Sequence, residues 1–189
     1  GAAGNVNLTT SAGDIAASAI TATGNDVVLD AAGSISDGNG ATTNIVSTNL
    51  DATAATGIDL DTAVDSITAV VSGTGVVDIN EFDAVTLTSV TTNDGSITVA
   101  AGGTLTASVV TAGGADADDD VSLSTSVGDI AASAITATGN DVTLNAAGSI
   151  TDGNGATTNI SAANLDATAA TGIDLDTAVD SITAVVSGT

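Results

Sequence analysis

The stretch SVGDIAASAITATGNDVTLNAAGSITDGNGATTNISAANLDATAATGIDLDTAVDSITAVVSGT, residues 126–189, decides the fold, because residues 11–74 spell nearly the same sequence. Over these 64 aligned positions 57 residues are identical, at a constant offset of 115 residues. A chain that repeats itself this closely is an array of structural units rather than one irregular domain. The fold must therefore be one that grows by adding units.

The 115-residue period contains shorter units of 20–26 residues, each opening with alternating apolar residues. The first unit opens with VNL at residues 6–8, and further starts fall near residues 27, 50, 76, 96 and 121. Such alternation places Val, Ile and Leu on one face of a strand and Thr, Ser, Asn and Asp on the other. Turn clusters such as ATGND and SDGNG separate the runs. We therefore predict five coils in residues 6–120 and a partial second long repeat in residues 121–189.

The chain lacks strong helix formers other than Ala and Leu and is rich in Val, Ile, Thr, Gly, Asn and Asp, which favours strands and turns over helices. Coils of this length cannot bury an apolar face alone and must stack on one another. We predict an all-β fold in which residues 1–189 form one continuous β-solenoid. The alternative is a tandem of immunoglobulin-like sandwiches, since 115 residues would fit one such domain, although the chain lacks the Trp, Tyr and Cys common in those cores.

The composition excludes several classes of function. The chain has no Lys, Arg, His or Cys, and its net charge is −23. Phosphate clamps, zinc fingers and triads that need histidine are therefore unavailable, and we expect no binding of nucleic acid. Polar residues interrupt every apolar run, so we expect no insertion into a membrane. We also expect no enzyme, because acidic pairs such as Asp59/Asp61 recur in both copies whereas an active site needs one irregular cleft.

The segments VTLNAAGSITDGNG, GSITVAAGGTLTASVV and GDIAASAITATGNDVTLNAAGSI resemble the repeats of filamentous-haemagglutinin-like adhesins and related giant bacterial surface proteins. This resemblance covers nearly the whole chain. It implies a right-handed parallel β-helix, export to the cell surface, and a role in adhesion or as an extracellular fibre. The expected function is an extracellular structural protein that forms a stiff rod or filament, and the alternative is the stalk of a bacterial surface adhesin.

Neither end of the sequence has the polar character of a capping unit. A free solenoid end exposes unpaired strand edges and apolar side chains, which favours pairing with another chain. We therefore expect either a longer array or self-association, end to end or side by side. Phe82, the single aromatic residue, is expected to fill the core or to contact a neighbouring rod.

Two groups of aspartates are candidate calcium ligands. Asp116, Asp118 and Asp120 have the alternate spacing that begins many calcium loops, and Asp59 and Asp61 lie in the segment GIDLDTAVDS. Calcium prefers several hard oxygen ligands, which carboxylates supply. No stretch completes an EF-hand pattern, so the alternative is a set of solvated acidic corners that keep a fibre soluble. In either case aspartates on adjacent coils repel one another, and we expect cations to stabilise the fold.

Overall fold

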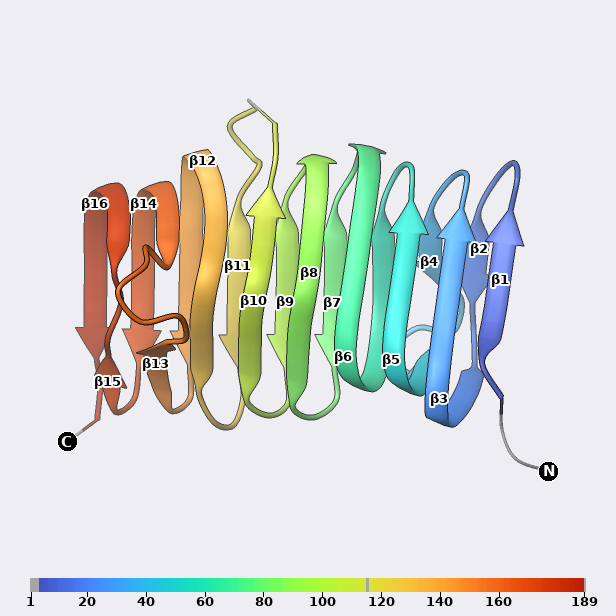
Figure 1. Ribbon diagram of the computed structural model, residues 1–189, viewed down its shortest axis with the longest axis horizontal. Helices are drawn as coiled ribbons and strands as arrows, with labels where there is room; N and C mark the ends of the chain where they lie inside the picture. The colour runs from blue at the N-terminus through green and yellow to red at the C-terminus, as the bar shows by residue number, and fades with distance from the viewer. Residues whose placement is uncertain (1–3, 115, 189) are drawn as a thin grey trace.

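The computed structural model describes residues 4–114 and 116–188 as a stack of about nine β-coils. The coils follow one another along a rod, with the first strand at one end and the last strand at the other (Figure 1). All sixteen strands belong to one sheet. The strands are β1 (Val6–Thr10), β2 (Ile15–Ala17), β3 (Ile20–Ala31), β4 (Ile35–Asp37), β5 (Ile45–Ala54), β6 (Ile58–Thr74), β7 (Val77–Glu81), β8 (Val85–Asp94), β9 (Ile97–Ala101), β10 (Leu105–Ala112), β11 (Val121–Thr125), β12 (Ile130–Ala146), β13 (Ser149–Asp152), β14 (Ile160–Ala169), β15 (Gly172–Ile173) and β16 (Thr177–Val186).

The predicted all-β solenoid is confirmed. The described residues contain no helix, and the strands form a parallel sheet that winds around the rod. The tandem-sandwich alternative is wrong, because sandwiches of that class are built from antiparallel strands. Within the described part of the chain, no helix is long and apolar enough to cross a membrane.

The interior is a set of aliphatic columns that run along the rod axis. One column continues through every turn, each residue pairing with the next: Ile15, Ile35, Ile58, Val77, Ile97, Val121, Val142, Leu165 and Ile182. Each fully buried aliphatic side chain contributes roughly 1.5–3 kcal/mol. At about 4.8 Å between neighbouring strands, nine turns make a rod roughly 40 Å long.

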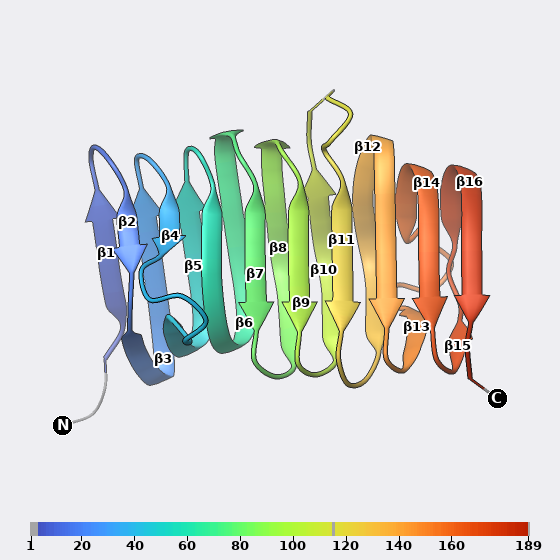
Figure 2. The same cartoon turned by 180° about the vertical axis from the view of Figure 1, so that it is seen from behind.

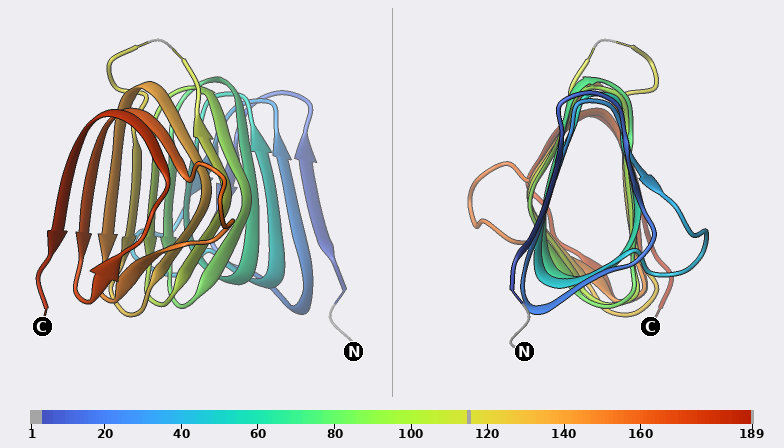
Figure 3. Two further views of the ribbon diagram at one scale, coloured as in Figure 1. Left: turned by 60° about the vertical axis from the view of Figure 1, so that its left-hand side comes forward. Right: turned by 90° about the vertical axis from the view of Figure 1, so that its right-hand side faces the viewer.

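The coil has two long sides, seen end-on in Figure 3. The column of Ile15 lies on one side, which we call the second side. The first side carries another column, made of Val6, Val27, Leu50, Ile67, Leu87, Ala107 and Ala132. Figures 1 and 2 show the two sides from the front and from behind, with β1 on the first side and β11 on the second.

The long repeat and the turns of the solenoid are out of phase. The starts predicted near residues 6, 27 and 50 lie on the first side, but Val77, Ile97 and Val121 lie on the second side. From Val6 the first-side column advances five turns to Ala107, so the 115 residues to Val121 span five turns and part of a sixth. The division of residues 6–120 into five coils therefore differs from the observed pairing. The reason is that Leu50 pairs with Ile67, so this turn is much shorter than the predicted units.

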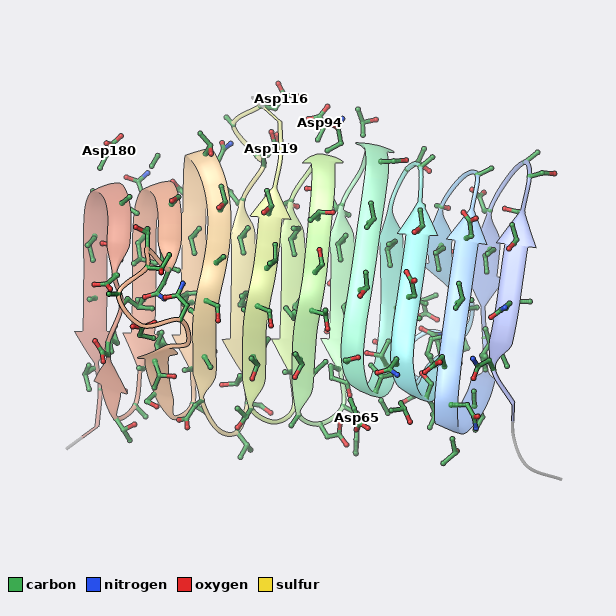
Figure 4. The ribbon with its side chains drawn as sticks, viewed as in Figure 1. Asp65, Asp94, Asp116, Asp119 and Asp180 are labelled. Carbon is green, nitrogen blue, oxygen red and sulfur yellow. The ribbon has the colours of Figure 1, made fainter. Side chains whose placement is uncertain are left out.

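As a result, equal segments of the two copies face in opposite directions. The loop after β4 and the matching loop after β13 project from opposite sides of the coil (Figure 3). Figure 4 likewise places Asp65 at the lower edge of the rod and its counterpart Asp180 at the upper edge. The inward pattern of β3 is nevertheless kept in β12, with Ala22, Val27 and Leu29 buried like Ala137, Val142 and Leu144. Both sides of the coil thus accept the same small aliphatic residues.

Candidate functional site

The two end coils present apolar edges. Leu8 in the first coil is 40% exposed, whereas its counterpart Leu123 is fully buried. At the other end Ile182 is 55% exposed, whereas its counterpart Ile67 is fully buried. Because each pair has the same residue at the same position of the repeat, the neighbouring coil alone accounts for the difference. The exposure of Leu8 and Ile182 therefore reflects the place of each residue in the described stack, whereas Phe82 and Val127, which are more exposed, lie between the end coils.

The acidic loop between β10 and β11 brings Asp116 and Asp119 near Asp94 of β8 at the upper edge of the rod (Figure 4). Burial raises the pKa of Asp94, and the negative charges of Asp119, Asp116 and Asp118 raise it further. The Asp119 side chain is buried and accepts a hydrogen bond from the Asp116 N–H at 3.0 Å. This loop therefore concentrates negative charge, and the protein has no basic side chain that could balance it.

The predicted calcium ligands of this loop do not all converge. Asp116 and Asp118 are exposed, whereas Asp120 turns to the next coil and accepts a hydrogen bond from the Asp141 N–H at 2.9 Å. Across residues 4–114 and 116–188, no group of three acidic side chains is arranged to hold a metal ion. Calcium binding stays a prediction from the sequence.

The second predicted pair, Asp59 and Asp61, lies on β6 beside other carboxylates. Asp59 is directly opposite Asp78 of β7. Burial raises the pKa of Asp59, followed by the charges of Asp78, Asp37 and Asp61. Like charges opposite each other in a sheet destabilise it, so this stack is a site of electrostatic repulsion.

Relief of this repulsion gives a testable prediction. The variant Asp78→Asn should raise the free energy of unfolding by up to about 1 kcal/mol in low salt, because it removes the charge opposite Asp59. The gain in stability should shrink above about 0.15 M NaCl, because dissolved ions weaken the repulsion between the two carboxylates. The Debye length at this ionic strength is about 8 Å. Urea unfolding at both salt concentrations measures it. An equal gain at both concentrations would show that repulsion is not the cause.

A buried carboxylate, that of Glu81, lies at the last residue of β7. The Thr62 hydroxyl donates to Glu81 Oε2 at 2.6 Å, and the Val64 N–H donates to the same oxygen at 3.1 Å. The Asp83 N–H donates to Glu81 Oε1 at 3.2 Å. Burial is the main cause that raises the pKa of Glu81, to about 7. The single glutamate of the chain is therefore a group that changes charge near neutral pH.

Phe82 lies beside Glu81 and points outward. Its side chain is 76% exposed, so the prediction that it fills the core is wrong. It lines two shallow open hollows, one shared with Ala41 and Asp61 and the other with Gly102 and Ser126. A single exposed aromatic ring beside small residues is a contact point, but its surroundings select no ligand.

Comparison with known protein families, with curated proteins and with solved structures finds no match. The architecture is that of a β-helix repeat protein.

Two buried asparagines fix the projecting loops. Asn44 donates to the Ala17 carbonyl at 3.0 Å and to Asp37 Oδ1 at 2.8 Å, and its own Oδ1 accepts from the Asp61 N–H at 2.7 Å. Asn159 makes the same contacts in the second copy, to Ala132, Asp152 and Asp176. The sequence marked these segments as turns but did not identify the asparagines as their buried anchors.

Proposed function

We propose that this protein is an extracellular structural protein whose function is to form a stiff rod or filament by stacking β-solenoid coils. The unbroken column from Ile15 to Ile182 is the observation that carries this proposal. Each coil packs only on its neighbours, so such an array lengthens without any change in its core. A role as a structural element rather than an enzyme agrees with the repetition of the acidic residues in both copies.

The second candidate is the stalk of a bacterial surface adhesin of the filamentous-haemagglutinin-like class. The resemblance of the repeat segments to those adhesins favours it, together with the solenoid architecture. A stalk would carry a separate binding domain at its tip, whereas a filament subunit would be uniform along its length.

Electron microscopy with an antibody against the exposed loop at residues 38–43 tests both candidates. On intact cells we expect labelled filaments of uniform width, with an axial spacing of about 4.8 Å in diffraction from the filaments. Label restricted to a stem below an unlabelled tip would favour the adhesin stalk. Label found only inside permeabilised cells would contradict an extracellular role.

A further inference from the structure

The exposed ring of Phe82 is a feature of the rod that its own packing does not explain. Phe82 is the single aromatic residue of the chain, and its side chain is 76% exposed although it lies between the end coils. The ring lines a hollow of about 330 Å³ together with Ala41, Thr43, Asp61, Asn80 and Glu81. The small residues around the ring select no ligand by themselves. Selection must therefore come from the acidic residues of this hollow and beyond it.

Three aspartates continue from the hollow along the second side of the coil. Asp61 lines the hollow, and Asp59 lies two residues before it on β6. Alternate residues of a strand point to the same face, so both project outward while Leu60 between them is buried. Asp78 of β7 lies directly opposite Asp59. These three carboxylates and the ring of Phe82 are called the acidic strip below, since together they extend along the two strands.

The acidic strip has no counter-charge among the side chains of the protein. The chain contains no Lys, Arg or His, so its carboxylates cannot form ion pairs with its own side chains. Burial raises the pKa of Asp59, and the charges of Asp78, Asp37 and Asp61 raise it further. At the hollow, Glu81 is only 4% exposed, and burial is the main cause that raises its pKa to about 7. Both shifts disfavour the carboxylate anion, and a cation bound at the acidic strip would oppose them.

The layout of the acidic strip fits an elongated organic cation better than a metal ion. Across residues 4–114 and 116–188, no three acidic side chains are arranged to hold a metal ion. The Cα atoms of Asp59 and Asp61 are about 6.6 Å apart along the strand, so the negative charge is spread over a line. An aromatic ring offers no oxygen ligand, but it attracts an ammonium group within about 6 Å of its centre. The matching ligand has ammonium groups separated by short carbon segments.

We propose that the acidic strip binds a linear polyamine, with one ammonium group between the Phe82 ring and Asp61 and a second between Asp59 and Asp78. The carbon segment that joins the two groups then lies over the paired strands β6 and β7. The net charge of −23 attracts such cations to the rod, and the ring gives this site a contact that other acidic positions lack. This binding role goes beyond the proposed structural function and does not depend on it.

Nuclear magnetic resonance tests the proposal directly, because Phe82 is the only aromatic residue of the chain. In protein labelled with isotope-enriched phenylalanine, every ring signal therefore belongs to this site. Titration with spermidine in low-salt buffer near neutral pH should shift these signals in a saturable manner. The ring should also show nuclear Overhauser contacts to the methylene protons of spermidine. Ring signals that stay unchanged while calorimetry detects bound spermidine would place the polyamine elsewhere and overturn the proposal.

Matched variants separate this site from general attraction to an acidic protein. Phe82→Leu keeps an apolar side chain but removes the ring, and it should weaken spermidine binding about fivefold. Asp61→Asn should weaken it about threefold. The control is Asp166→Asn, which removes one charge from the outward column of Asp78, reached through Thr98, Ser122 and Thr143, and should have little effect.

Titration calorimetry measures the dissociation constants, and urea unfolding checks that each variant is folded. Equal losses of affinity in Asp61→Asn and Asp166→Asn, with none in Phe82→Leu, would show that spermidine follows net charge alone and would overturn the site. Calcium is the second probe. If calcium binds at the acidic strip with an affinity that Phe82→Leu leaves unchanged, and excludes spermidine at equal concentration, the strip is a metal site and the polyamine proposal is wrong.

Discussion

Leu60→Ala is expected to lower the free energy of unfolding by about 2–5 kcal/mol, the range for removing a buried leucine side chain. Leu60 is fully buried and lies opposite Ile79 of the next coil. Leu175→Ala, the same change at the same position of the second copy, should cost only about 1 kcal/mol in the monomer, because that side chain is already partly exposed. Urea unfolding at a protein concentration below self-association measures both.

The two leucines are matched in sequence, so their comparison isolates the neighbouring coil. Equal costs at low concentration would contradict the view that the coil beyond a residue provides most of its burial. Hydrogen exchange of the β6 amides would locate the loss in the Leu60→Ala variant.

Glu81→Gln is expected to stabilise the protein at pH 8 by about 1–3 kcal/mol and to have little effect near pH 4.5. The pKa of Glu81 is raised from 4.5 to about 7, so the folded protein binds the proton more tightly than the unfolded chain. The stability that the neutral carboxyl contributes is fully present below pH 4.5 and is lost as pH rises through 7. Glutamine keeps a neutral group at every pH, and urea unfolding across this range measures the difference.

The control is Glu81→Met, which also removes the charge but offers no acceptor to the N–H groups of Val64 and Asp83. Its stability relative to the wild type should follow the same pH trend as the glutamine variant, at a level lower by about 1–3 kcal/mol. Parallel pH curves for the wild type and Glu81→Gln would rule out a raised pKa at this position.

The strands and their inward faces could be predicted from the sequence because short alternating runs determine them locally. Val27 and Leu29 show this, since their spacing alone identified the inward face. The number of turns in a long repeat could not be predicted in the same way. Both sides of the coil are filled by Ala, Val, Ile and Leu, so the run that begins at Val121 fits the second side as well as Val6 fits the first.

The buried glutamate, Glu81, was not predicted from the sequence, although a pattern that could have identified it is present. Val77, Ile79 and Glu81 alternate, and this spacing directs all three side chains inward. The carboxylates of the acidic loop show the opposite case, in which a sequence pattern predicted a cluster that the structure does not form. The spacing of Asp116, Asp118 and Asp120 suggested convergence, but Asp120 is drawn away by the N–H of Asp141, which is distant in sequence.

Because the 115-residue period is not a whole number of turns, the two copies of the repeat are related by a rotation about the rod axis as well as a shift along it. One period advances the chain along the axis and carries the loop after β4 to the opposite flank, where the loop after β13 projects (Figure 3). A longer array with this period would therefore carry the same projecting loops on both flanks, rather than a different surface on each flank.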